Sequence, residues 1–298
     1  MTQPGPPPGQ AACYRHSDRA TGIACTRCGR PICPDCMRQA SVGFHCPECV
    51  REGQASVRRP RGQSGVQRFA ARWGAATTTL VALNVAAYLV TVIAALPNGG
   101  GVMQNDASML FREFSLFPAC VTGEFRIQGI CDGGGDQPWR LLSSAFLHFG
   151  LFHLVMNMLA LLVLGADLER YLGRARFVAV FLVSAVSGGA AVALFADPIS
   201  QTVGASGGVF GLLGAAAVVI LHNKGDLRPL VSVLVLNAII SFLPGISLLG
   251  HLGGLIGGML AAVVLVYGRR STAMQITGLA VLVAAAVVPV LLQGPTLV

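Results

Sequence analysis

Residues 203–214 read VGASGGVFGLLG and lie inside a long apolar run. Five of these twelve residues are glycine, and Ser206 is the only one that carries a hydroxyl group. Glycine at this density allows the backbones of two membrane helices to approach closely. The stretch therefore predicts a helix packed inside a membrane bundle, and it leaves open why a hydroxyl group is held at so crowded a contact.

The chain around this stretch is strongly apolar: of its 298 residues, 53% are hydrophobic and only 11% are charged. Soluble domains carry about 25% charged residues, so most of this chain is expected to lie in lipid. From residue 75 onward, apolar segments of roughly membrane-spanning length follow one another. The composition predicts an all-α polytopic membrane protein. The seven expected transmembrane helices are 75–96, 148–166, 175–195, 204–221, 228–243, 249–267 and 274–293.

The basic residues are unevenly placed, and eleven of the 21 precede the first apolar run. Cytoplasmic flanks of membrane proteins collect Lys and Arg, and the predicted outer connections 196–203 and 244–248 contain neither. Only the long outer loop 97–147 breaks this pattern. We expect a multi-pass protein of the cell membrane, with a cytoplasmic N-terminus and an external C-terminus. Nucleic-acid binding is the weaker interpretation of the basic stretch, because no fold of that kind accompanies it.

Composition divides the chain into four regions. Residues 1–12 are rich in Pro and Gly and predict a disordered tail without a secretory signal. Residues 13–50 hold seven of the nine cysteines. Residues 51–74 are basic and predict a linker along an anionic lipid surface. The transmembrane domain is expected over residues 75–295.

The cysteines of residues 13–50 predict metal binding, because most occur in pairs separated by two residues. Eight ligands suit two tetrahedral structural Zn²⁺ ions with no open position. Since only four residues separate Cys28 from Cys33, we expect alternating pairs to share a metal. The first expected set is Cys13, His16, Cys33 and Cys36, and the second is Cys25, Cys28, Cys46 and Cys49.

This pattern looks like a B-box-type zinc finger, with His45 as an alternative to one ligand. A module of about forty residues needs the metal to fold. A cytosolic protein partner is its expected function, with DNA binding or simple anchoring as alternatives. The other two cysteines, Cys120 and Cys131, lie in the predicted outer loop. They form a disulfide or remain two free thiols.

Polar residues recur at one predicted depth of the membrane. His153 and Asn157 share a face of the second helix at i, i+4 spacing, Ser206 opens the fourth helix, and His251 opens the sixth. All three helices are predicted to run inward from the outer face. Polar groups at membrane depth are costly and usually functional. Gly254, three residues after His251, belongs to a glycine stripe that would let the fourth and sixth helices approach.

A serine beside a histidine is an activated nucleophile, because the imidazole takes the hydroxyl proton during attack on a carbonyl. The resulting oxyanion needs fixed donors, which the Ser206 backbone N–H, the His153 ring and the Asn157 amide would supply. The nearest carboxylates, Asp167 and Glu169, lie at the opposite end of the second helix. The sequence therefore predicts a catalytic dyad, and no metal or other cofactor for the chemistry.

These motifs together resemble the rhomboid family of intramembrane serine proteases. The resemblance covers roughly residues 75–270. GASGGVFG is similar to the family's GxSGxx(Y/F)G motif, HFGLFHLVMN to its second-helix signature, and HLGGLIGG to its HxxGxxxG motif. Trp139-Arg140 falls where rhomboids carry a Trp-Arg pair in the first outer loop, and Glu169 with Gly173 resembles the polar pair after helix two.

The resemblance implies a six-helix bundle with a seventh C-terminal helix. It implies Ser206 as nucleophile, His251 as base, His153 and Asn157 as oxyanion donors, and His148 as a structural residue. Phe210 stands where many relatives have tyrosine. The implied activity is serine endopeptidase cleavage of transmembrane protein substrates near the outer face. The alternative is a noncatalytic membrane adaptor that binds transmembrane clients.

Overall fold

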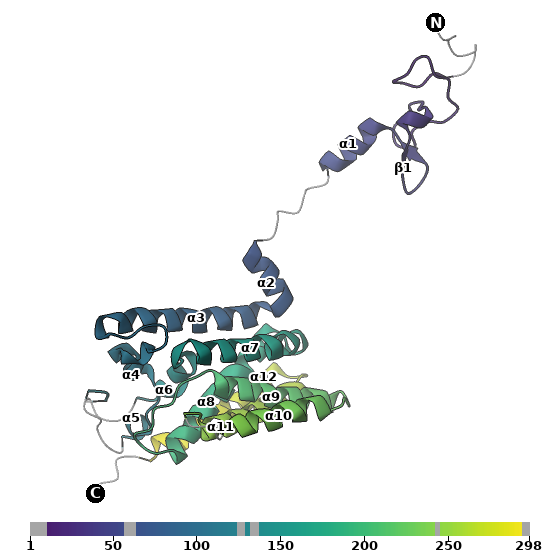
Figure 1. Ribbon diagram of the computed structural model, residues 1–298. Coiled ribbons are helices and arrows are strands. Elements are labelled where there is room, and N and C mark those ends of the chain that lie inside the picture. Colours follow the sequence, from purple (N-terminus) through teal and green to yellow (C-terminus); the bar gives the residue numbers. More distant parts are fainter. Residues whose placement is uncertain (1–10, 57–63, 124–128, 132–136, 242–244, 294–298) are drawn as a thin grey trace. The chain divides into compact units, whose positions relative to one another are not determined.

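The computed structural model describes residues 11–56, 64–123, 129–131, 137–241 and 245–293 (Figure 1). The chain forms two units, residues 1–63 and 64–298. Most of the expected tail, residues 1–10, and the middle of the expected linker, residues 57–63, lie outside the described residues.

The first unit contains little regular structure. Its elements are η1 (Pro34–Cys36), β1 (Arg38–Gln39), β2 (Phe44–His45) and α1 (Pro47–Ser56), and the two strands pair antiparallel. Six of its cysteines are buried, together with Ile32. A core made mainly of thiol groups buries too little apolar surface to stabilise an ordinary small domain. We therefore expect the stability of this unit to depend on metal binding by its cysteines.

The second unit is an all-α polytopic membrane bundle, as predicted. Its long helices are α3 (Ala75–Ala95), α7 (Gly150–Leu172), α8 (Arg174–Phe195), α11 (Leu248–Tyr267) and α12 (Thr272–Leu291). All five are long and apolar enough to cross a membrane. The apolar helices α9 (Ser206–His222) and α10 (Arg228–Ile240) are shorter. The remaining helices are α2 (Gly65–Trp73), α4 (Met109–Phe114), α5 (Pro118–Thr122) and α6 (Arg140–Ser143), with η2 (Leu96–Asn98), η3 (Asn105–Ala107) and η4 (Ser144–Phe146).

The boundaries differ from the sequence prediction mainly at α7, which was expected to end at residue 166. The helix continues to Leu172 because Leu168 and Leu172 are both buried in the main hydrophobic core. Glu169 in this extension accepts hydrogen bonds from the backbone N–H groups of Ala76 and Thr77, at 3.0 and 2.8 Å. A carboxylate there satisfies free donors at the start of α3 and complements its dipole.

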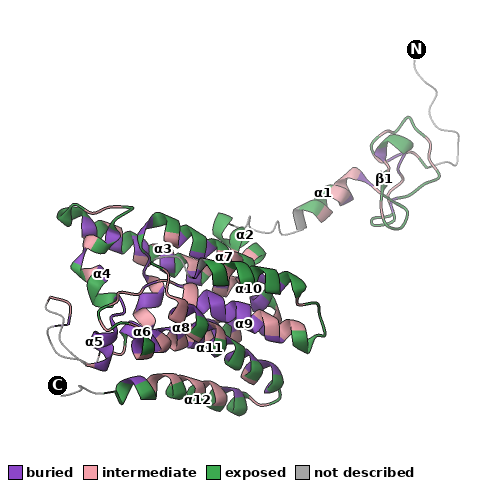
Figure 2. Cartoon of the chain, turned by 60° about the horizontal axis from the view of Figure 1, so that its bottom comes forward, coloured by how far each residue is buried: buried purple, intermediate pink, exposed green. Residues whose placement is uncertain are grey.

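Helices α8, α9 and α11 pack most closely and form the centre of the bundle, whereas α12 is largely exposed (Figure 2). The expected contact between the glycines of α9 and α11 is confirmed. A Cβ atom built at Gly254 would overlap the carbonyl oxygen of Gly207, and one at Gly258 would overlap that of Gly211. Two other glycines of these helices, Gly208 and Gly257, instead face side chains of α8.

We expect Gly258→Val to destabilise the bundle, because the new side chain would have to displace the Gly211 backbone. Overpacking of this kind costs about 1–3 kcal/mol. The matched control is Leu260→Val, on an exposed face of the same helix. Thermal unfolding in detergent should show a lower Tm for Gly258→Val only. Equal Tm values for the two variants would contradict the close backbone contact.

The long loop before α7 is held by buried polar groups. Arg140 is fully buried, and its guanidinium donates to the carbonyl oxygens of Arg112, Ser115 and Ile130 at 2.7, 2.6 and 3.1 Å. Cys120 and Cys131 form a disulfide, which decides between the two alternatives left by the sequence. The described parts of this loop are thus folded elements of the bundle.

Candidate active site

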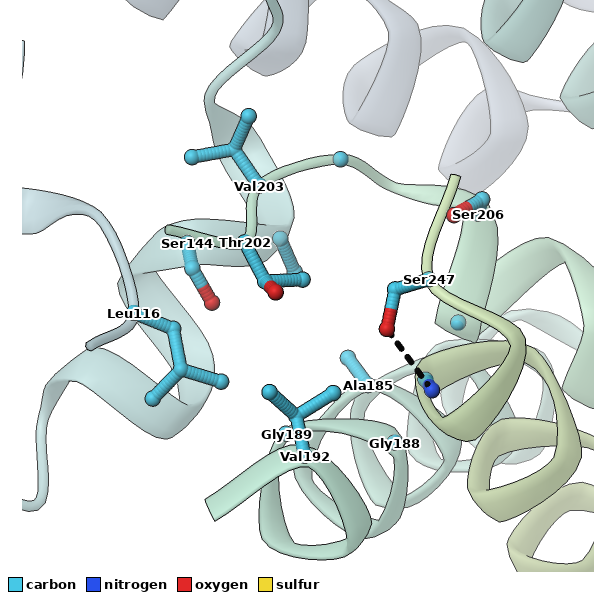
Figure 3. Close-up of a pocket in the computed structure, with 14 residues that line it drawn as sticks. Leu116, Ser144, Ala185, Gly188, Gly189, Val192, Thr202, Val203, Ser206 and Ser247 are labelled. Carbon is cyan, nitrogen blue, oxygen red and sulfur yellow. Dashed lines mark hydrogen bonds between the residues drawn. The ribbon is translucent and has the colours of Figure 1, made fainter. Parts of the chain in front are cut away.

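Ser206 is the first residue of α9 and follows a turn at Gly204, which has a φ of +129°. That backbone conformation favours glycine. The first N–H groups of a helix have no partner within the helix, so the Ser206 N–H is placed where it can meet an incoming acceptor. The helix dipole adds partial positive charge at the same point. Ser206 borders a small cavity (Figure 3).

The His251 ring is buried and stacks on Phe210, with the ring centroids 4.0 Å apart and the planes 13° from parallel. Phe210 lies one turn after Ser206 on α9, because the two residues are four apart in this helix. This stacking fixes the plane of the imidazole beside the N-terminal end of α9. Among the described residues, no hydrogen bond joins Ser206 to His251. Catalytic hydrogen bonds are often long in the absence of substrate and tighten only in the complex.

His153 has a defined donor atom. Its Nδ1 accepts a hydrogen bond from the Phe149 backbone N–H at 3.2 Å. In a neutral imidazole the other nitrogen then carries the proton. A Cβ atom built at Gly204 would lie 2.8 Å from this nitrogen, Nε2, and 3.6 Å from the Ser206 Oγ. Both atoms therefore border the same point beside Gly204. The structure therefore places an N–H donor of α7 close to Ser206.

Asn157, on α7, and His148, just before this helix, have different surroundings. The Asn157 amide donates to the His153 carbonyl of its own helix at 3.0 Å. His148 is fully buried, and its Nε2 accepts from the Ala205 backbone N–H at 3.5 Å. His148 also packs edge-on against His153, with centroids 5.0 Å apart. His148 thus lies against the turn that leads into Ser206.

The cavity beside Ser206 has a volume of about 30 Å³. Its polar lining includes the side chains of Ser144, Thr202 and Ser247, and Figure 3 shows the bond from the Gly250 N–H to the Ser247 hydroxyl. A water molecule needs about 10–15 Å³ of such space and two or more polar partners. The cavity is therefore suited to a water molecule or a small side chain next to the hydroxyl of Ser206.

The first unit contains two candidate metal centres, grouped as the sequence predicted. Cys13, His16, Cys33 and Cys36 form one cluster, and Cys25, Cys28, Cys46 and Cys49 form the other. Within each cluster the potential ligand atoms lie within 4.8 Å of one another. His45 belongs to neither cluster and pairs with Arg38 across the two strands.

The donor sets fit a tetrahedral metal ion. Zn–S bonds of about 2.3 Å hold the sulfurs of a tetrahedral site about 3.8 Å apart, and the Cys28 and Cys46 sulfurs are 3.8 Å apart. In the other cluster, His16 Nδ1 lies 3.3 Å from the Cys33 sulfur. The Arg30 guanidinium donates to Cys28 and lowers the pKa of this thiol to about 6, which favours the thiolate that a metal requires. Both clusters could therefore bind metal ions.

Two polar residues near the site were missed by the sequence analysis. Asn105 is fully buried, and its side chain donates to the His148 carbonyl and accepts from the Gly150 N–H, both at 2.9 Å. Ser241 contacts the His251 ring, with its Oγ 2.6 Å from Nδ1. Neither belongs to a motif with a regular spacing, so no pattern in the sequence marked them.

Comparison with known proteins shows the family of this chain. The family model described as Rhomboid domain matches residues 135–268. The chain is 32% identical over 139 residues to the putative rhomboid protease YdcA of Bacillus subtilis (strain 168), covering 44% of this chain and 68% of that protein. The chain belongs to the rhomboid family. The matched segment contains Ser206, His251, His153 and Asn157, whereas the two candidate metal centres lie outside it.

Other rhomboid relatives are longer than the shared segment. RHOMBOID-like protein 4 of Arabidopsis thaliana is 40% identical over 138 residues, which are 44% of this chain and 35% of that protein. Rhomboid protease GluP of Bacillus subtilis (strain 168) is 39% identical over 133 residues, which are 43% of this chain and 26% of that protein. The chain thus spans well under half the length of these two relatives.

Proposed function

We propose that this rhomboid-family chain is an intramembrane serine endopeptidase with Ser206 as nucleophile and His251 as general base. The observation that carries the proposal is the ring of His251, stacked on Phe210 one turn after Ser206 at the start of α9. Relatives that are named as rhomboid proteases support the same reaction class.

The proposed reaction is hydrolysis of a peptide bond through an acyl-enzyme. The Ser206 hydroxyl oxygen attacks the carbonyl carbon while His251 takes the hydroxyl proton. The oxyanion accepts hydrogen bonds from the Ser206 N–H and from His153 Nε2, with Asn157 as a further donor through its second amide proton. His251 then returns the proton to the leaving amine. A water molecule, for which the cavity beside Ser206 has room, hydrolyses the ester by the same steps.

The proposed substrates are transmembrane segments of membrane-anchored proteins, cleaved near the outer face of the cell membrane. In this orientation the N-terminus is cytoplasmic and the C-terminus is outside, which agrees with the basic residues that precede α3. The metal-binding unit would hold two structural Zn²⁺ ions, each surrounded by four protein ligands, and would bind a cytosolic protein partner. A closed site of that kind supplies folding energy, not catalysis.

Labelling with a fluorophosphonate in detergent tests the proposed function, because this reagent reacts with an activated serine. We expect labelling of the natural chain and none of Ser206→Ala. The control is Ser232→Ala, which removes an exposed serine of α10 and should label normally. Labelling that does not depend on Ser206, together with no cleavage of transmembrane substrates, would instead favour the noncatalytic adaptor.

A further inference from the structure

Ser241 directly follows α10 and differs from that helix in its surroundings. Most of α10 is exposed, including Val235, Leu236 and Ile239 with 53%, 59% and 63% of their surface accessible. Ser241 is only 2% exposed, and His251 is 6% exposed. The residue that follows α10 thus brings one buried hydroxyl group to the side of the imidazole that carries Nδ1.

The hydrogen bonds of Ser241 determine which nitrogen of His251 carries the proton. The Ser241 Oγ lies 2.7 Å from the Asn237 carbonyl oxygen, which can only accept, and 2.6 Å from His251 Nδ1. The hydroxyl has a single proton, so both contacts contain a proton only when the hydroxyl donates to the carbonyl and accepts from Nδ1. Nδ1 is therefore protonated, and in the neutral ring Nε2 keeps a free lone pair.

We propose that Ser241 is a positioning residue that holds His251 in the tautomer in which Nε2 is the base. This inference rests on the proposed function, because a base is needed only if Ser206 is a nucleophile. Phe210 fixes the plane of the ring by stacking. Ser241 fixes the rotation of the ring within that plane and determines which ring nitrogen carries the proton. The dyad then has a third, neutral member, supplied by the residue that follows α10.

The surroundings explain why a hydroxyl group, and not a carboxylate, occupies this position. A cavity of about 250 Å³ lies between α9, α10 and α11. Of the nine residues that line it, only Ser241 and His251 are polar. A carboxylate in such an apolar setting would carry a large desolvation cost unless it were paired with a cation. A serine satisfies Nδ1 without introducing charge, and its own proton has a partner in the Asn237 carbonyl.

Kinetics of Ser241→Ala in the full chain, with a transmembrane substrate in detergent, test this proposal. We expect kcat to fall roughly tenfold with KM unchanged, because one hydrogen bond to the base is lost and no substrate contact. Ser232→Ala is the matched control: Ser232 also donates to the carbonyl four residues earlier, at 3.2 Å from Arg228 O, but is exposed. Ser241→Thr keeps the oxygen and should restore most of kcat.

The outcomes are distinguishable. A lower kcat in Ser241→Ala, normal kinetics in Ser232→Ala and rescue by Ser241→Thr support the positioning role. Equal kcat values for the two alanine variants overturn it. A loss of kcat that accompanies a lower Tm and is not rescued by threonine also overturns it, because the residue is then structural. Activity in Ser206→Ala, measured in parallel, would instead overturn the proposed function.

Discussion

Ser206→Ala is expected to abolish cleavage of a transmembrane substrate while leaving the bundle folded. His251→Ala should have the same effect, because alkoxide formation needs the base. Residues that act as one unit are not additive, so the double variant should be no worse than either single variant. A loss of at least roughly 10³-fold in kcat is expected for each. Initial rates in detergent measure this loss of kcat, and the Tm of every variant shows whether the bundle remains folded.

Two exposed residues supply matched controls for this pair. Ser232→Ala removes a serine of α10, and His222→Ala removes the histidine at the end of α9, whose ring packs edge-on against Tyr267. Both should keep activity within about twofold. Substantial turnover by Ser206→Ala would contradict the mechanism, and a multiplicative loss in the double variant would show that the two residues act separately.

Metal removal is expected to unfold the first unit and leave the membrane bundle intact. The core of this unit consists mainly of six buried cysteines, and metal binding supplies about 10–16 kcal/mol in comparable zinc modules. The bundle has its own hydrophobic core. Chelation should therefore make residues 11–50 sensitive to protease and release two Zn²⁺ ions per chain. Limited proteolysis and elemental analysis measure both effects.

Cys46→Ser tests the same prediction without a chelator. Cys46 is fully buried in the second cluster, so its replacement should have the same effect as chelation. Labelling of Ser206 by the fluorophosphonate should be unchanged in both cases. Deleting residues 1–60 should likewise keep cleavage within a few-fold of the full chain. A lower Tm of the bundle after chelation or in Cys46→Ser would show that the two units are coupled. A truncated chain that is labelled by the fluorophosphonate but does not cleave substrate would show the same.

Much of this architecture follows from local patterns in the sequence. The apolar runs predicted the apolar helices to within a few residues at most ends, because a helix in lipid must satisfy its own backbone groups. The i, i+4 spacing of His153 and Asn157 predicted that both residues share one face of the second helix. The short separation of Cys28 and Cys33 predicted that alternating pairs cluster, since adjacent pairs are too constrained to surround one ion.

Contacts between distant segments were decided only by the tertiary structure. Arg140 donates to three carbonyl groups of the loop, Glu169 caps α3, and Cys120 bonds to Cys131 rather than remaining free. These partners depend on how the chain turns between elements, which no periodicity records.

The protonation of the His251 ring also depends on both the sequence and the tertiary structure. The sequence by itself determined that a serine, two histidines and glycine-rich helices share one bundle, because helical spacing and apolar length are local properties. Only the tertiary structure decided that Ser241 meets Nδ1 of His251, because that contact joins the end of α10 to the first turn of α11. A single hydroxyl proton, already donated to Asn237, then determines the tautomer.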